Sequence, residues 1–407
     1  MSGVFLSGIR LYGMVLRRYV SDMKNWKLEG ATIALLVCFL AIFFPPICAS
    51  AQEATPSDAL AFEQQEKWDE AAQVWQTVIQ KNPNDAAALA SLGVDLSKEQ
   101  KYQEASSTYK KAIALNPKLP GVQLNLGLAE FKQGHFQAAI DPLRVAYAAG
   151  RNSQQACTLL GLSYYGTKQF AEAAKYLESA EKSDPGNAEL HEVLAQSCLW
   201  AKKYSCALNE FRQILRQNPN SSSTHMLSGE ALDGLGKTSE AIAEFQVATK
   251  VSPQEANLHF GLGYLYWKSH QYDEAKREFD NALAIDPNHP QALAYLGDIE
   301  IKRDNLDEAL PLLRKAVQVK NDNRLAYVDL GAILMQKKNY ADAAVALRRA
   351  LELDPAQPDA HYRLGRVYQA MGNAKDSEKE FAKVHELHQK TDESVASKMS
   401  AAPPPLQ

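Results

Sequence analysis

The sequence predicts an all-α solenoid, an α-α superhelix of about ten helical hairpins that are each 34 residues long. Three observations favour this fold class. The chain repeats itself with a period of 34 residues from Gln52 to about Thr391, without an insertion or deletion. Two places in every repeat carry only small side chains, and the apolar residues within a repeat recur with helical spacing. One hairpin cannot bury its apolar face alone, so we expect residues 52–391 to form a single elongated array.

Small side chains occupy the same two places in all ten repeats, where places are numbered 1 to 34 and repeat 1 starts at Gln52. The eighth place is glycine or alanine: Ala59, Gly93, Gly127, Gly161, Ala195, Gly229, Gly263, Gly297, Gly331 and Gly365. The twentieth place is alanine or serine: Ala71, Ala105, Ala139, Ala173, Ala207, Ala241, Ala275, Ala309, Ala343 and Ser377. Two helices that cross closely at these places leave no room for a larger side chain.

Each repeat is expected to contain a first helix, a polar turn and a second helix. In repeat 7 the residues on one face of each helix are Leu262, Gly263 and Tyr266, then Ala275, Phe279 and Ala282. The polar segment 268–271 between them is the expected turn. A proline, which disfavours helix at the residue before it, closes seven of the ten repeats: Pro83, Pro117, Pro185, Pro219, Pro253, Pro287 and Pro355.

This pattern resembles that of the tetratricopeptide-repeat family. The family has a leucine and a small residue in the first helix, followed by alanine, an aromatic residue, alanine and proline. Repeat 2 reproduces this pattern with Leu92-Gly93, Ala105, Tyr109, Ala112 and Pro117. Repeats that depart from it have Arg151, Asn321 or Gln389 in place of the proline and Ser228 in place of the leucine. The resemblance implies a non-enzymatic scaffold whose first helices line a concave groove.

The first 51 residues differ in kind from the repeats. Five basic residues precede a 14-residue apolar run from Ala31 to Phe44, and Ala49-Ser50-Ala51 follows. A basic flank, a short apolar centre and a small-residue end are typical of a secretory signal peptide. We expect cleavage after Ala51 and export to the periplasm or cell envelope. The alternative is an inner-membrane anchor formed by residues 31–51, which would be the chain's contact with a membrane.

Two further boundaries follow from the composition. A conventional signal peptide would start at Met23, so residues 1–22 are a candidate for a mis-assigned extension. A capping helix is expected from Ala374 to Lys390, because lysine and glutamate suit a solvent-facing end of the array. Residues 392–407, which include three consecutive prolines, are predicted to be a disordered tail.

The charge balance argues against nucleic acid as a partner. Without residues 1–51 the chain has 39 Lys and Arg against 46 Asp and Glu, a net charge of −7. No excess of basic residues is left to neutralise phosphates. A protein or peptide segment is therefore the expected partner, with no nucleic acid and no small-molecule substrate.

No catalytic constellation, cofactor site or metal site is predicted. The segment 234–238 resembles the end of a phosphate-binding loop, but Ala231 stands where that motif needs glycine. Four histidines share the fourth place of their repeats and are expected to be packing residues: His191, His225, His259 and His361. His385 and His388 share a face of the capping helix but lack a third ligand. Cys198 and Cys206 lie in one hairpin, where two free thiols are favoured over a disulfide.

Large apolar side chains on the first helices indicate a binding face. Places 2, 5, 9, 12 and 13 point away from the packed stripe, and most aromatic residues elsewhere recur in structural columns. The predicted groove residues are Phe131, Tyr165, Glu189, Glu192, Trp200, Met226, Glu230, Asp233, Phe260, Tyr264 and Trp267. Apolar groups on a face that folding does not need to bury suggest binding, and the carboxylates favour a partner with Lys or Arg. The alternative is that the rings pack between neighbouring first helices.

Three classes of function remain in view. An exported scaffold that binds a protein segment is favoured. The second class is a permanent component of a cell-envelope assembly, similar to the repeat proteins of pilus, polysaccharide-export or cytochrome-maturation systems. The third is the accessory repeat region of an enzyme system, which we disfavour because residues 392–407 are too few for a catalytic domain.

Overall fold

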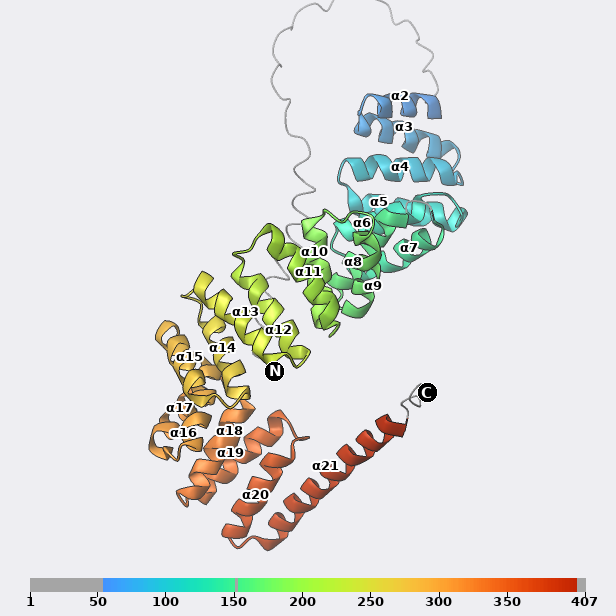
Figure 1. Cartoon of the computed structure of the whole chain (residues 1–407). Helices are drawn as coiled ribbons and strands as arrows, with labels where there is room; N and C mark the ends of the chain where they lie inside the picture. The colour runs from blue at the N-terminus through green and yellow to red at the C-terminus, as the bar shows by residue number, and fades with distance from the viewer. Residues whose placement is uncertain (1–53, 151–152, 401–407) are drawn as a thin grey trace, which may run out of the picture. The chain divides into compact units, whose positions relative to one another are not determined.

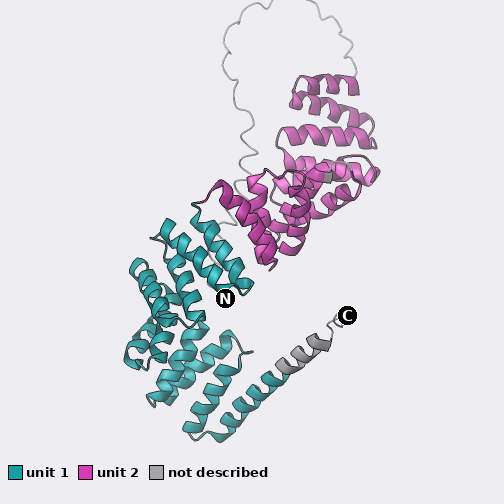
Figure 2. Cartoon of the chain, viewed as in Figure 1, with its two compact units in different colours: residues 1–5, 220–407 teal, residues 6–219 magenta. Residues whose placement is uncertain are grey.

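The computed structural model describes residues 54–150 and 153–400, with side chains as far as Lys390. The expected signal peptide, residues 1–51, lies outside the described residues. The described part contains twenty α-helices and no strand (Figure 1), so the all-α fold class is confirmed. The described part divides into two compact blocks (Figure 2): the N-terminal block, residues 54–219, and the C-terminal block, residues 220–400.

The N-terminal block contains five helical hairpins, one for each of repeats 1 to 5. Its helices are α2 (Pro56–Gln64), α3 (Trp68–Lys81), α4 (Ala86–Lys98), α5 (Tyr102–Leu115), α6 (Val122–Lys132), α7 (Phe136–Ala148), α8 (Ser153–Gly166), α9 (Phe170–Glu181), α10 (Ala188–Trp200) and α11 (Tyr204–Gln217). Each second helix also packs against the first helix of the next repeat, as α3 does against α4. The hairpins of the block therefore form one stack.

The C-terminal block contains five more hairpins, for repeats 6 to 10. Its helices are α12 (Ser222–Gly234), α13 (Thr238–Val251), α14 (Ala256–Lys268), α15 (Tyr272–Ile285), α16 (Pro290–Lys302), α17 (Leu306–Val319), α18 (Arg324–Gln336), α19 (Tyr340–Leu353), α20 (Pro358–Ala370) and α21 (Ala374–Ser400). The last helix corrects the expected boundary of the tail. It runs ten residues beyond Lys390, because residues 391–400 contain no proline or glycine to end it.

Several first helices begin at a capping side chain at place 34 of the preceding repeat. Asp85 Oδ1 accepts hydrogen bonds from the backbone N–H groups of Ala87 and Ala88. Asn187 and Asn323 accept in the same way from Leu190 and Ala326. These oxygens satisfy backbone donors that have no partner within the helix, so place 34 fixes where these helices start.

The first helices end in one turn that recurs in all ten repeats. The residue at place 15 has positive φ throughout: Glu66, Gln100, Gly134, Lys168, Lys202, Gly236, His270, Asp304, Lys338 and Gly372. The next N–H donates back to the carbonyl five residues earlier, as from Lys101 to Leu96 at 2.8 Å. This bond closes a Schellman-type end, which lets the chain reverse into the second helix.

The hairpin cores explain why place 8 is small. A Cβ atom added to Gly263 would lie 2.8 Å from the ring of Phe279 and 3.3 Å from the carbonyl oxygen of Ala275. Phe279 and Ala275 are fully buried. The same clash, between place 8 and the large side chain at place 24, recurs at Gly93 and Gly331. The predicted close crossing of the two helices is thus present.

Among the helices of the described residues, none combines the length and the apolar character that a membrane span requires.

Candidate binding face

Four of the predicted groove residues belong to the core. Phe131 and Tyr165 are 0% exposed, and Met226 and Phe260 are 6% exposed. A partner cannot contact rings that the chain itself covers. The prediction that these four residues line an open groove is therefore wrong, and for them the alternative of packing within the array holds.

Rings at place 12 reach the first helix of the next repeat. Tyr165 stacks on Trp200 with the ring centroids 5.8 Å apart, and its hydroxyl donates to Gln196 Oε1. Gln196 is itself buried and lies 31 residues further along the chain. Successive first helices approach closely enough to cover the ring, which explains why Tyr165 is buried.

Trp200 keeps an exposed edge in the N-terminal block. It is half-buried and packs against Phe170 at 4.6 Å between ring centroids. Glu189 and Glu192 lie on the same helix, α10, and are also half-buried. This helix therefore keeps one indole and two carboxylates partly exposed.

The C-terminal block has a larger cluster of partly exposed rings, which we call the aromatic patch: Tyr264 and Trp267 on α14, and Tyr295 on α16. All three are half-buried. Tyr295 contacts Trp267 at 4.9 Å and Tyr264 at 5.6 Å between ring centroids, both edge to face. The indole Nε1 of Trp267 donates to Asp298 Oδ2 at 2.6 Å. These contacts hold the rings in fixed orientations.

Two lysines neutralise carboxylates around the aromatic patch. Lys268 Nζ lies 2.6 Å from Asp233 Oδ1, and Lys302 Nζ lies 2.5 Å from Asp298 Oδ1. Lys302 is also 5.7 Å from the centre of the Trp267 ring. Asp233, a predicted groove residue, is therefore already paired within the chain.

Two carboxyl groups of the same block, that of half-buried Glu230 and that of buried Asp329, each keep a buried oxygen without a hydrogen-bond partner in the described part of the chain. Glu230 Oε1 and Asp329 Oδ2 have no hydrogen-bond partner among the described residues. Burial raises the pKa of Glu230 to about 8. Burial and the nearby Asp298 raise the pKa of Asp329 to about 7. Near neutral pH both groups are partly protonated, so a cation that reached them would release a proton.

The four histidines at place 4 pair with glutamates at place 23 of the same repeat. His191, His225, His259 and His361 place Nδ1 2.6, 2.6, 2.7 and 2.5 Å from Oε2 of Glu210, Glu244, Glu278 and Glu380. This geometry agrees with the prediction that the four histidines are packing residues. The two partners of each pair are 19 residues apart, and this recurring spacing is a signal for the pairs in the sequence.

Cys198 and Cys206 form a disulfide, with their Cα atoms 5.8 Å apart. This corrects the preference for two free thiols. Cys198 lies near the end of α10 and Cys206 near the start of α11, so the Schellman-type turn brings the two close together. Cys157 is the free cysteine of the described part and is buried.

Three family models match the chain. The TPR repeat model matches residues 96–134, 229–269 and 331–372. Two tetratricopeptide repeat models match residues 58–96 and 260–324, and residues 164–231. The chain belongs to the tetratricopeptide-repeat family. The search of curated proteins found no match.

Several solved structures resemble this tetratricopeptide-repeat chain in fold. Yeast Tom70 is 16% identical, with 85% of this chain and 94% of that chain covered and a TM-score of 0.41. YrrB, described as a TPR protein with an unusual peptide-binding site, is 22% identical, with 46% and 97% covered and a TM-score of 0.37. MamA from Desulfovibrio magneticus RS-1 is 23% identical, with 42% and 97% covered and a TM-score of 0.37.

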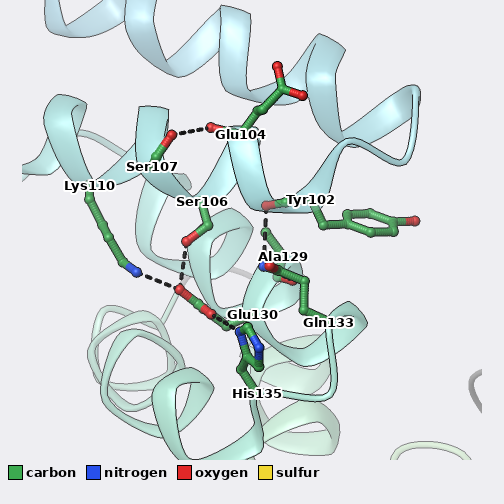
Figure 3. A network of polar contacts seen from close by, with 9 residues as sticks. All are labelled: Tyr102, Glu104, Ser106, Ser107, Lys110, Ala129, Glu130, Gln133 and His135. Atoms are coloured by element: carbon green, nitrogen blue, oxygen red, sulfur yellow. Dashed lines mark hydrogen bonds and ion pairs between the residues drawn. The ribbon is translucent and has the colours of Figure 1, made fainter.

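Two of the tetratricopeptide repeats also bury a glutamate at place 11, which the sequence pattern did not predict. Glu130 is 4% exposed and receives hydrogen bonds from Ser106 and Lys110, each at 2.6 Å, while His135 Nδ1 lies 3.1 Å away (Figure 3). Burial alone would raise the pKa of Glu130, but these contacts outweigh it and lower the pKa. Glu300, also at place 11, is held by Lys276 and Asn305. These two glutamates therefore tie neighbouring repeats together.

Proposed function

We propose that the chain is an exported, non-enzymatic scaffold that binds an extended protein segment along the first helices of the C-terminal block. Tetratricopeptide-repeat proteins are in general interaction scaffolds without catalytic activity. The observation that carries this proposal is the aromatic patch, whose three rings are oriented by the fold yet keep exposed surface. Rigid, partly exposed aromatic side chains supply much of the binding energy in protein interfaces.

The chemistry around the patch favours a segment with both apolar and basic side chains. Apolar side chains would cover the exposed edges of Tyr264 and Trp267. Because Asp233 and Asp298 already have lysine partners and Asp329 is buried, the carboxyl group that would select a basic side chain is Glu230. A Lys or Arg beside Glu230 would replace its proton by a charge-assisted hydrogen bond.

A peptide-display library, panned on the purified chain, tests this function. We expect enriched peptides to combine apolar with basic residues. Their affinity should rise as the pH is raised from 6 to about 8, since Glu230 ionises over this range while a lysine of the peptide stays protonated. The variant Glu230→Gln should weaken binding about tenfold and remove most of this pH dependence.

The matched control is Glu240→Gln, on the second helix α13, where an exposed glutamate pairs with Lys237. This variant should bind the peptides as the wild type does. Enrichment of acidic peptides, or equal binding by the Glu230→Gln variant, would show that the ligand is of another kind or binds elsewhere.

Export is the second part of the proposal. It is supported by the signal-peptide pattern of residues 1–51 and by the Cys198–Cys206 disulfide, since disulfides persist in oxidising compartments. N-terminal sequencing of the protein from its native host should find Gln52 as the first residue. Recovery of cytosolic protein with residues 1–51 attached would overturn the export proposal and leave the binding proposal standing.

A further inference from the structure

Three side chains with metal-binding atoms converge at the border of repeats 4 and 5. Glu178 comes from α9, Cys198 from α10 and Cys206 from α11, and their ligand atoms all lie within 4.8 Å of one another. In the described part of the chain this is the one group of three such residues that meets in this way. Cys198 is fully buried, whereas Cys206 and Glu178 are partly exposed, so a small ion has access from solvent.

The contact between Glu178 and the disulfide is not a hydrogen bond. Glu178 Oε1 lies 3.6 Å from Cys206 Sγ. A sulfur in a disulfide carries no hydrogen, so carboxylate and sulfur lone pairs face each other there. Lys203 Nζ also lies 3.6 Å from this oxygen, and the side chains of Lys203 and Glu178 are both partly exposed. A cation between the three groups, or protons on the two sulfurs, would make this arrangement favourable.

We propose that the reduced form of this cluster is a binding site for a thiophilic divalent cation such as Zn²⁺. A dithiol reductant supplies two electrons and two protons, which break the S–S bond and leave two thiols, and the reductant becomes a disulfide. The cation then displaces the two thiol protons and binds two thiolates and the Glu178 carboxylate. Two sulfurs and one oxygen match the donors that zinc accepts, and water completes a four-coordinate site.

Disulfide and metal compete for the same two sulfurs, so each excludes the other. A bound cation stabilises the reduced form by mass action, and oxidation releases the cation. The cluster would therefore couple the redox state of repeat 5 to metal occupancy. This proposal is independent of the ligand that the aromatic patch binds.

Titration of the chain with Co²⁺, before and after reduction by a phosphine under argon, tests the proposal. The reduced chain should bind one Co²⁺ with a thiolate-to-cobalt charge-transfer band in the near ultraviolet, and Zn²⁺ should displace it. The oxidised chain should show no such band. Glu178→Gln should weaken binding at least about tenfold, and Cys206→Ser should abolish the band.

Cys157→Ser is the matched control, because it removes the third thiol of the described part and leaves the cluster intact. This variant should bind Co²⁺ as the wild type does. Thermal unfolding of the Cys206→Ser variant shows whether repeat 5 folds without the disulfide. A folded, reduced chain that binds no Co²⁺, or an equal affinity in Glu178→Gln, overturns the proposal. So does a chain that unfolds on reduction even with metal present, because the proposed state would not exist.

Discussion

The residue at place 15 has a left-handed backbone conformation in every repeat, and in seven repeats it is not glycine. Side chains disfavour this conformation because their Cβ approaches the neighbouring carbonyl oxygen. Lysine at 168, 202 and 338 and Asp304 nevertheless adopt φ near +60°. The Schellman-type bond of the turn holds them there, so each of these turns stores strain that glycine would relieve.

Asp304→Gly is therefore expected to stabilise the chain by about 0.5–1 kcal/mol, since glycine reaches the observed φ of 64° without steric cost. The reverse change, Gly236→Ala, should destabilise by about 1 kcal/mol, because Gly236 has a φ of 75°. Thermal midpoints of both variants measure these effects. Equal shifts of the same sign in the two variants would show that the turn is not strained.

The surroundings of His191 couple the stability of the chain to pH. Its Nδ1 faces Glu210 Oε2 and its Nε2 faces the carbonyl oxygen of Pro185, so both ring nitrogens meet acceptors. Burial alone would lower the pKa of His191, but these hydrogen bonds and the charges of Glu210 and Glu181 outweigh it and raise the pKa. A raised pKa in the folded state gives stability that is complete below the unfolded pKa and is lost as the pH rises through the folded value.

His191→Gln should consequently cost about 1.5–3 kcal/mol at pH 6 and clearly less at pH 9. Urea unfolding at pH 6, 7, 8 and 9 measures the difference from wild type. His270→Gln is the control, because His270 is exposed and its Nδ1 contacts the Tyr272 hydroxyl and not a carboxylate. A cost for His191→Gln that stays constant with pH would mean that the ring is neutral and merely packs.

At the scale of the element, the hairpin depends on the contact between places 8 and 24. Gly263 has no space for a Cβ beside the fully buried Phe279 ring, and the Ala275 carbonyl closes the other side. A larger side chain must push α14 and α15 apart. In a stack where each hairpin touches its neighbours in sequence, this damage stays local.

Gly263→Leu is expected to destabilise the C-terminal block by at least about 1–3 kcal/mol through overpacking. Hydrogen exchange should become faster in α14 and α15 and in the adjacent helices α13 and α16. Exchange in α20 and α21 should change little. Uniform acceleration throughout residues 220–400 would contradict the nearest-neighbour description of this block.

The helices and turns were predictable because the residues that specify them recur every 34 residues. Places 8, 20 and 24 and the closing prolines each appear as a column, so the helices and turns could be placed from sequence. The burial of Tyr165 could not be predicted in this way, because it depends on how closely the next first helix approaches. That distance is a property of the stack and not of one repeat. A hint was present, since Gln196 and Asp298 each follow a ring by 31 residues and accept its hydrogen bond.

At the scale of the whole molecule, most of the side chains discussed above recur at equivalent places of the repeats and stabilise the fold. Few of them differ from the repeat pattern and are candidates for function. Repeated positions account for the glycines at places 8 and 15 and for the histidine–glutamate pairs, and the buried Glu130 and Glu300 share place 11. The repeat does not account for the aromatic patch and Glu230 on first helices of the C-terminal block, for Trp200 on a first helix of the N-terminal block, or for the cluster of Glu178, Cys198 and Cys206. We infer that binding depends on these exceptions to the repeat.

The most direct test of this claim is hydrogen exchange on the chain with and without a bound apolar and basic peptide from the display library. The account predicts slower exchange in the first helices α12, α14 and α16, which carry Glu230, Trp267 and Tyr295. Protection confined to the second helices α13, α15 and α17, or absent from residues 220–400, would contradict it.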